Sequence, residues 1–297
     1  MTKTDTTILE ARGRQIAFPR RPLIMGILNI NDDSFSGDGR LDSGWALERA
    51  AELTALGADI IDVGAESART NRGPISEDEE FGRLEIFLRC FESAVAGASP
   101  RDGHQVFPPL LSVNTWRTDV ARRALGIAGD ILNDMSALPD AAHARLCAES
   151  GSALLIMHSV GLPKEKHTHV RYGDVVAEVE EFFREKIAMA CRAGLPVPRI
   201  ILDPGIDFAK QAADNLRLFA GLERLVRLGR PVLLPVSRKS VIGRTLDIAE
   251  PAARDAGTAA CLIAGARRGA AIFRVHNVEL AWRCLVTLDA VQGGPGV

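Results

Sequence analysis

Short, continuous apolar runs recur along the chain, and longer stretches of mixed apolar and polar residues separate many of them. The runs are residues 23–28, 59–63, 110–113, 131–133, 153–157, 199–202, 231–236 and 272–275. Continuous apolar runs are typical of parallel strands buried on both faces, whereas half-exposed strands alternate apolar and polar residues. The pattern therefore predicts eight parallel strands.

The segments between these strands have the spacing of amphipathic helices. The clearest are residues 43–56, 118–125, 175–193, 215–228 and 255–268. Eight strand–helix units within about 250 residues predict a (β/α)8 barrel of the TIM type. The alternative is an open doubly wound sheet, which favours a glycine-rich phosphate fingerprint after its first strand. The sequence contains no such fingerprint after residues 23–28.

The N-terminal residues predict a β-hairpin that turns at Gly13, within the sequence "TTILEARGRQIAF". A hairpin over residues 1–22 can cover the N-terminal end of the barrel. No stretch of the sequence resembles a linker, so we expect residues 1–297 to form a single domain. Residues 98–109 and 159–173 are the least regular and are expected to be surface loops.

Charge and cysteine content limit the classes of partner. The formal net charge is −2, so no strong basic field invites nucleic acid or an anionic membrane. No stretch reaches the roughly 18 uninterrupted apolar residues that a membrane span requires. The five cysteines are far apart and form no CxxC pair, which favours reduced thiols and argues against a zinc cluster. We expect a cytoplasmic protein that acts on small molecules.

Polar or charged side chains follow every predicted strand, which is where the chemistry of a (β/α)8 barrel is found. The amides of Asn114 and Asn133 and the carboxylate of Asp203 suit a flat heterocycle with amide-like edges. Cationic candidates for binding an anion are Arg69, Arg238, Lys239, Arg274 and His276. A single aspartate at a strand end, such as Asp33 or Asp203, is more often a helix cap than a catalyst. The whole set nevertheless predicts a site for two small partners, at least one of them anionic.

Seven ordered motifs make a family resemblance recognisable. "MGILNINDDSFSGDG" resembles the first signature of dihydropteroate synthases, and "DIIDVGAESAR", "SVNTWRTDVARRAL", "DILNDMSAL", "ILDPGIDFAK", "SRKS" and "FRVHNV" resemble the others. The resemblance covers roughly residues 23 to 280. It implies a pterin-binding barrel that joins 6-hydroxymethyl-7,8-dihydropterin diphosphate to 4-aminobenzoate and releases pyrophosphate. It also implies Mg²⁺ as cofactor and a homodimer formed through C-terminal helices.

The same resemblance implies roles for individual residues. Asn114, Asn133, Asp203 and Lys239 would hold the pterin, and Arg274 with His276 would hold the diphosphate. Asn29 would help to hold Mg²⁺. The 4-aminobenzoate would meet Ser240, with Arg69 and the first two loops closing over it, and Arg238 is a further candidate for substrate binding. The candidates for catalysis are Asp33, Asn114, Lys239 and Arg274.

Several positions depart from the family pattern. The third motif carries Asn114 where the family has aspartate, and in the fifth motif the family's glycine–phenylalanine–glycine–lysine run is Asp207-Phe208-Ala209-Lys210. The first two loops lose residues that shape the aminobenzoate pocket, which predicts weaker inhibition by sulfonamides. Two alternatives follow: a paralogue that binds a pterin but uses another amine or turns over weakly, and a methyl-tetrahydrofolate methyltransferase relative. The second has no need of "SRKS" or "RVH".

Overall fold

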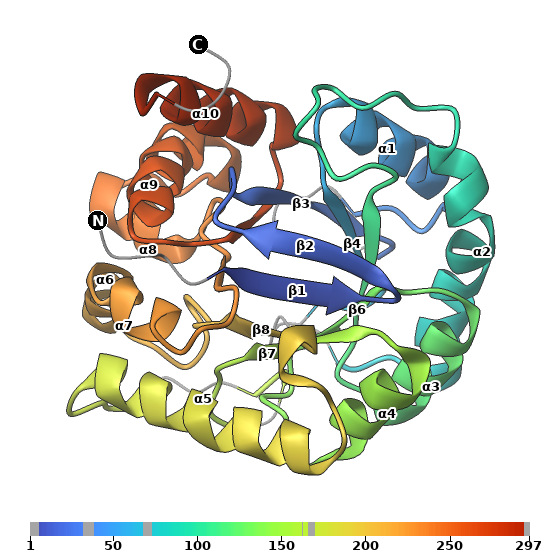
Figure 1. Ribbon diagram of the computed structural model, residues 1–297, viewed down its shortest axis with the longest axis horizontal. Helices are drawn as coiled ribbons and strands as arrows, with labels where there is room; N and C mark the ends of the chain where they lie inside the picture. The colour runs from blue at the N-terminus through green and yellow to red at the C-terminus, as the bar shows by residue number, and fades with distance from the viewer. Residues whose placement is uncertain (1–5, 32–38, 68–72, 162, 166–169, 294–297) are drawn as a thin grey trace.

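The computed structural model describes residues 6–31, 39–67, 73–161, 163–165 and 170–293. Eight parallel strands follow one another around a barrel, and helices surround it (Figure 1). The barrel strands are β3 (Leu23–Asn29), β4 (Ile60–Gly64), β5 (Leu110–Asn114), β6 (Ile131–Asp134), β7 (Ala153–Met157), β8 (Ile200–Asp203), β9 (Leu233–Leu234) and β10 (Ile272–Val275). The predicted (β/α)8 class is confirmed.

The strands run in sequence order around the barrel, β8-β7-β6-β5-β4-β3-β10-β9. Closure between the two ends of this order is made by a parallel bridge between Leu202 and Val232, where the backbone N–H of Leu202 donates to Pro231 O at 3.0 Å. Strand β9 is only two residues long because Pro231 and Pro235 flank it, and proline cannot donate to a strand ladder.

Helices follow the strands as the periodicity predicts. They are α1 (Ser43–Ala55), α2 (Glu77–Val95), α3 (Thr118–Ile127), α4 (Ala142–Ser150), α5 (Val175–Arg192), α6 (Ala212–Ala220), α7 (Leu222–Val226), α8 (Ser240–Leu246), α9 (Asp255–Arg267) and α10 (Val278–Val291), with 3-10 turns at Val197–Arg199 and Pro251–Arg254. The single helix predicted over 215–228 is two helices that divide at Gly221, where a Cβ would lie 2.8 Å from Val176. None of the described helices is both long and apolar enough to cross a membrane.

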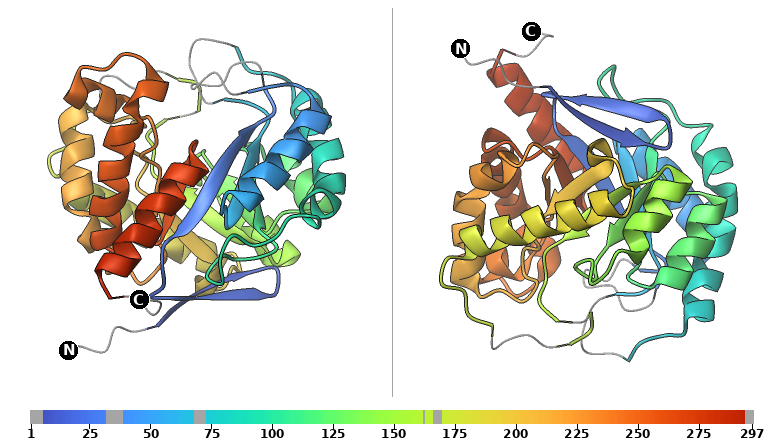
Figure 2. Two further views of the ribbon diagram at one scale, coloured as in Figure 1. Left: turned by 90° about the horizontal axis from the view of Figure 1, so that it is seen from above. Right: turned by 60° about the horizontal axis from the view of Figure 1, so that its bottom comes forward.

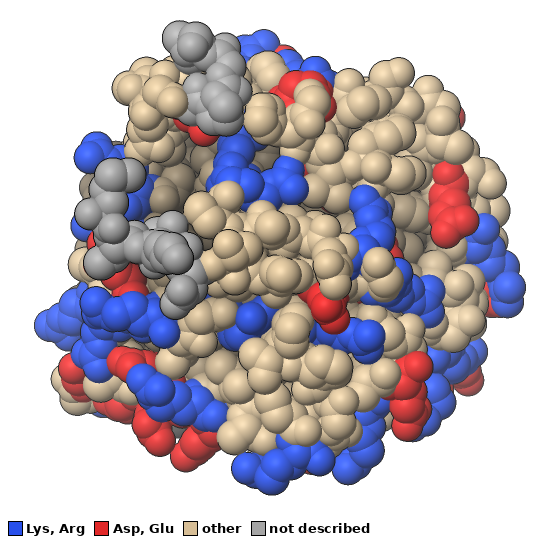
Figure 3. Space-filling model, viewed as in Figure 1, with Lys and Arg blue, Asp and Glu red and all other residues tan. Residues whose placement is uncertain are grey.

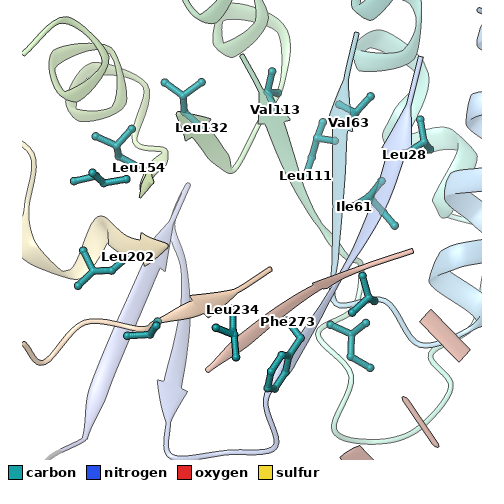
Figure 4. Packing of buried hydrophobic residues seen from close by; sticks show 14 of the residues in the cluster. Leu28, Ile61, Val63, Leu111, Val113, Leu132, Leu154, Leu202, Leu234 and Phe273 are labelled. Atoms are coloured by element: carbon teal, nitrogen blue, oxygen red, sulfur yellow. The ribbon is translucent and has the colours of Figure 1, made fainter. Parts of the chain in front are cut away.

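The outward residues of the strands form one apolar core with the helices. Leu28, Ile61, Val113, Leu154 and Phe273 are buried in it, together with the other residues labelled in Figure 4. A second buried cluster fills the lower interior of the barrel with residues such as Leu23, Leu110 and Ile272. Both faces of each strand are therefore buried, which is why the strands read as continuous apolar runs.

The predicted hairpin consists of β1 (Thr7–Ala11) and β2 (Arg14–Phe18), which pair antiparallel. Its inward side chains Leu9, Ile16 and Phe18 belong to the cluster inside the barrel. The side chain of Arg230 donates to Ile8 O at 2.7 Å and so fastens the hairpin to the barrel. The hairpin lies across the N-terminal ends of the barrel strands (Figures 1 and 2).

The hairpin face of the molecule carries Lys and Arg around an uncharged centre, with Asp and Glu between them (Figure 3). The irregular residues 98–109 lie on this side and are firmly anchored. Asp102 pairs with Arg21 at 2.8 Å and accepts from the Trp282 ring N–H at 2.8 Å. Gln105 donates to Thr54 O and Ala58 O, each at 2.8 Å. The predicted surface loop therefore also ties the hairpin end to the barrel.

Candidate functional site

A buried carboxylate, Asp62, organises the polar upper interior of the barrel. Ser112 Oγ donates to Asp62 Oδ1 at 2.6 Å, and Arg274 Nε donates to Asp62 Oδ2 at 2.7 Å. Asn133 Nδ2 lies 3.1 Å and 3.3 Å from the two carboxylate oxygens. These partners come from β5, β6 and β10, so one side chain on β4 links four strands. Arg274 is the cation that compensates the buried charge of Asp62.

The amide of Asn114 is oriented by the same carboxylate. Its Nδ2 lies 3.5 Å from Asp62 Oδ2, a long contact. Because a carboxylate can only accept hydrogen bonds, the NH2 group must face Asp62 and the carbonyl oxygen must face away. That oxygen, Oδ1, is buried and has no hydrogen-bond partner within the described protein. An unpaired buried acceptor is costly, so Asn114 offers a position for a ligand N–H.

A cavity of about 300 Å³ opens above this cluster at the carboxyl ends of the strands. Its walls contain Asn29, Asn114, Lys239, Ser240, Arg274 and His276 from the predicted set, together with Ile27, Gly64, Glu66, Ser67, Met135, Asp207, Phe208, Pro235 and Ser237. Gly64 lies beside Asn114, and a Cβ there would be 3.4 Å from the Asn114 Cβ. The structure thus brings six predicted residues from four strands to one cavity.

The remaining predicted residues are not in the described walls of this cavity. Asn133 lies against Asp62 beneath it. The guanidinium of Arg238 forms a two-pronged pair with Asp255 of α9, with distances of 2.8 and 3.1 Å. Asp33 and Arg69 lie outside the described residues. Their functional roles stay predictions.

Asp203 is the second buried carboxylate of the upper interior. Burial raises the pKa of Asp203 to about 6, although the N–H of Gly205 at 2.7 Å and the positive charge of Lys239 favour the ionised form. Desolvation lowers the pKa of Lys239, whose Nζ lies 4.6 Å from the centre of the Phe208 ring. A carboxyl group with a raised pKa near a lysine with a lowered pKa is an arrangement that functional sites use.

Lys210 fastens the loop that follows Asp203. Its Nζ contacts His158 Nδ1 at 2.8 Å and donates to Phe208 O and Gly205 O at 3.0 and 3.1 Å. Burial lowers the pKa of Lys210 to about 7, and burial together with Lys210 lowers that of His158 to about 3. The neutral His158 ring packs edge-on against Phe182 with 4.7 Å between centres. His158 is therefore a packed structural group that supports the loop.

Asp207 and Ser240 meet on one wall of the cavity. Asp207 Oδ2 accepts from Ser240 N at 2.6 Å, from Ser240 Oγ at 2.9 Å and from Val241 N at 3.4 Å. The other oxygen, Oδ1, accepts from Asn215 Nδ2 at 3.0 Å. In the segments that follow β9 and β10, Ser237 Oγ lies 3.0 Å from His276 Nδ1. Ser240 and His276 are both held by side chains that line the cavity or its base.

A buried ionic network supports the loops after β4 and β5. Arg117 pairs with both Glu66 and Glu80 and donates to Ile75 O at 2.8 Å. Lys164, from the segment after β7, pairs with the other oxygen of Glu66 at 2.7 Å. Burial raises the pKa of Glu80, and Arg117 opposes that effect. Glu66 also lines the cavity, so the network fixes one of its walls.

Two residues of the site, Asp62 and Asp207, were not among the predicted set. Asp62 stands inside an apolar run, and a charged residue within a doubly buried strand is the signal that could have identified it. Its importance comes from register: Asp62 pairs with Ser112 and Gly64 pairs with Asn114 on the next strand. Asp134, at the end of β6, accepts from Ser136 N at 2.8 Å and Leu138 N at 3.0 Å and so holds its own loop.

The described residues contain no group of three His, Cys, Asp or Glu side chains able to hold a metal ion. A magnesium ion in enzymes of phosphate esters usually takes one or two protein oxygens, substrate phosphates and waters. The side-chain amide oxygen of Asn29, at the end of β3 and in the cavity wall, is an oxygen ligand of that kind. The donor set fits an ion held mainly through a substrate diphosphate.

Comparison with known proteins gives a consistent result. The model of the family described as pterin binding enzyme matches residues 25–276. The dihydropteroate synthase of Neisseria meningitidis serogroup C is 37% identical over 276 residues, which is 91% of this chain and 93% of the relative. The structure of Xanthomonas albilineans dihydropteroate synthase with 4-aminobenzoic acid aligns with a TM-score of 0.84 at 32% identity, covering 98% of this chain and 100% of that one. The complex of the same synthase with 7,8-dihydropteroate aligns with a TM-score of 0.81 at 33% identity, covering 97% and 100%.

Proposed function

Because the chain belongs to the pterin-binding enzymes and, among them, to the dihydropteroate synthase family, we propose that it joins 6-hydroxymethyl-7,8-dihydropterin diphosphate to 4-aminobenzoate. The products are 7,8-dihydropteroate and pyrophosphate, as in folate biosynthesis. The observation that carries the proposal is the buried polar cluster around Asp62 beneath a cavity lined by Lys239, Arg274 and His276. Amide and carboxylate groups lie beneath the cavity, and the basic side chains of Lys239, Arg274 and His276 line it.

The pterin ring would bind deepest. The Asp203 carboxylate suits the adjacent ring N–H and amino group, because a carboxylate can accept two parallel hydrogen bonds. Asn133 and the unpaired Oδ1 of Asn114 supply further hydrogen-bonding positions, and Lys239 can donate to a ring acceptor. Together these groups would fix the ring so that its exocyclic methylene faces the cavity.

The diphosphate would lie against Arg274 and His276 at the end of β10. The ion pair with Asp62 holds the Arg274 guanidinium in a fixed position, from which it can contact the diphosphate. We propose Asn29 as the protein ligand of Mg²⁺; when bound with the diphosphate, the ion neutralises charge that builds on the leaving group. The chain's own part is to hold the leaving oxygens in line with the methylene carbon.

Breaking the carbon–oxygen bond leaves positive charge on the methylene and pterin ring. Asp62 lies beside Asn114, so a carboxylate, paired with Arg274, would stand near the ring even though residue 114 is an amide. Fixed charges in a desolvated site are the largest source of stabilisation for such a cation. The arylamine nitrogen then attacks the methylene, and Ser240 would position the opposite end of the acceptor. The catalytic role proposed for Asp33 belongs to the same step.

The proposal is tested by coupled detection of pyrophosphate with pterin diphosphate, Mg²⁺ and 4-aminobenzoate. We expect release that requires all three, and loss of release in Asp203→Asn, which keeps the shape but loses one acceptor. Binding of the pterin diphosphate should be measured in parallel by calorimetry. Absence of both release and binding in the unaltered protein contradicts the proposal. Binding without release from any arylamine would instead favour the pterin-binding paralogue.

Three further expectations depend on the family rather than on any described contact. We propose a homodimer, a cytoplasmic location and reduced inhibition by sulfonamides. Helix α10 packs its buried residues Val278, Ala281 and Leu285 on its own barrel, so any dimer contact must use its outer face. Light scattering tests the dimer. Dose–response curves for sulfonamides, compared with a typical family member, test the third expectation, which rests on the altered residues 31–32, 68 and 70–71; of these, only Asn31 lies within the described part of the chain.

A further inference from the structure

The carboxylate of Asp207 occupies hydrogen-bond donors that line the candidate acceptor end of the cavity. Ser240 N and Ser240 Oγ both donate to Asp207 Oδ2, at 2.6 and 2.9 Å. Asp207 and Ser240 are both in the wall of the cavity, beside Phe208 and Lys239. A negative charge from the chain itself is therefore placed where an incoming group would meet the Ser240 hydroxyl.

The backbone and its neighbours hold this carboxylate in place. Asp207 has φ +67° and Ala209 has φ +50°, a left-handed conformation in which glycine is the usual residue and aspartate is one of the few tolerated alternatives. Asn215 is 2% exposed and contacts Asp207 twice: its Nδ2 donates to Oδ1 at 3.0 Å, and its Oδ1 accepts from the Asp207 N–H at 2.9 Å. Rotation of the carboxylate away from Ser240 would break the contact between Asp207 Oδ1 and Asn215 Nδ2, whereas the backbone contact holds Asp207 in its left-handed conformation.

Lys239 is a basic side chain in the same wall of the cavity. Desolvation lowers the pKa of Lys239, and the negative charges of Asp207 and Asp203 oppose that effect. An anionic group that approaches Ser240 would therefore meet the Asp207 carboxylate, which already accepts from both Ser240 donors. Like charges placed together in a binding site cost several kcal/mol, which makes them a determinant of specificity.

We propose that Asp207 widens acceptor specificity, so that the protein uses not only 4-aminobenzoate but also, and more readily, arylamines that are uncharged at the end opposite the amine. The inference rests on the proposed function, in which Ser240 positions that end of the acceptor. A donor group such as an amide NH2 can hydrogen-bond to Asp207, whereas a carboxylate cannot. A glycine at position 207 would leave the Ser240 donors available to a carboxylate.

The test compares 4-aminobenzoate with 4-aminobenzamide, which has nearly the same shape and no charge. The variants are Asp207→Asn, which removes the charge and tolerates the left-handed backbone, and Asp207→Gly, which also frees Ser240. Asp247→Asn is the matched control, because Asp247 is an exposed aspartate with φ +56° at the other end of α8. Pyrophosphate release and the Kd of each amine are measured with pterin diphosphate bound.

We expect the unaltered protein to prefer the amide by about tenfold in kcat/KM, and Asp207→Asn and Asp207→Gly to lower KM for 4-aminobenzoate by about tenfold or more. KM for the amide should rise, most in Asp207→Gly, which has no side-chain acceptor for the amide NH2, and Asp247→Asn should behave as the unaltered protein. If 4-aminobenzoate binds the unaltered protein as tightly as the amide and Asp207→Asn leaves that ratio unchanged, the inference is overturned. If no variant releases pyrophosphate with either amine, the proposed reaction fails, and the Kd ratio still decides the role of Asp207.

Discussion

Asn114 Nδ2 and Asp62 Oδ2 lie 3.5 Å apart on neighbouring strands, and the carboxylate orients the amide. The relationship explains how a barrel of this family can carry an amide at position 114. The charge is close by on Asp62, where Arg274 and Asn133 hold it. The consequence is that Asp62 and Asn114 act together, and changes at either residue should affect the same step.

Replacing Asp62 by Asn should reduce kcat for pyrophosphate release by about 100-fold, because removing one fixed charge from a desolvated site has effects of that size. It would also leave Arg274 without its compensating partner. Ser112→Ala removes one hydrogen bond to the same carboxylate and should cost far less. Steady-state rates and thermal unfolding are measured together. A folded Asp62→Asn variant with unaltered kcat would refute this role.

Asn114→Asp should place two carboxylates within about the distance that now separates Asn114 from Asp62. Two carboxylates so close share a proton, so the pair should titrate together with one pKa strongly raised. We expect the acidic side of the kcat profile to move to higher pH, with the rate recovering or exceeding that of the unaltered protein under alkaline conditions. Identical pH profiles for the two proteins would show that residue 114 does not interact with Asp62 during turnover.

The pKa of about 6 for Asp203 predicts the pH dependence of pterin binding. A raised pKa means that the group is protonated below about pH 6 and then accepts hydrogen bonds less well. kcat/KM for pterin diphosphate should therefore fall by about tenfold for each pH unit below that value. The folded state also binds this proton more tightly than the unfolded chain, so the contribution of Asp203 to stability is greatest at low pH and is lost as pH rises through about 6. Titration of pterin binding by calorimetry across pH 5 to 8, with Asp203→Asn as the comparison, measures the first effect.

Arg117→Met should destabilise the fold by about 3–5 kcal/mol, because it leaves Glu66 and Glu80 buried without their shared cation. The pKa of Glu80 is already raised by burial, so its protonation should relieve part of the loss at low pH. Denaturant unfolding at pH 5 and pH 8 measures the loss of stability and its partial relief at low pH. Arg123→Met, which removes pairings with the exposed Asp78 and Asp119 and a contact with the Phe81 ring, is the control and should change stability by about 1 kcal/mol or less. Equal losses in the two variants would contradict this account.

The barrel strands could be predicted because burial on both faces produces unbroken apolar runs, and the hairpin because its turn lies at Gly13. The division between α6 and α7 could not be predicted, since it depends on how closely Gly221 approaches Val176 from another helix. A helix was predicted between the strands now labelled β4 and β5, but the apolar pattern did not give the bounds of α2, although its N-terminus carries Ser76 as a cap and four acidic residues.

Some residues of the site could also be predicted from the sequence, and others could not. Asn114, Lys239 and Arg274 could be predicted from their places at strand ends, and they line one cavity. Asp62 required the register between β4 and β5, and Asp207 required the contact between two loops that are 33 residues apart in sequence. Contacts of this kind depend on the closed barrel and leave no local pattern in the chain.

The hairpin under the barrel limits the direction from which reactants can enter the site. Leu9, Ile16 and Phe18 fill the lower interior, so molecules reach the deepest positions from the opposite end only. A pterin that binds at the bottom must then arrive before the amine that binds above it. Product must depart by the same route, and an amine that enters first would block the enzyme. We therefore expect a compulsory order of addition, with the pterin first, because the small N-terminal hairpin covers the other end of the barrel.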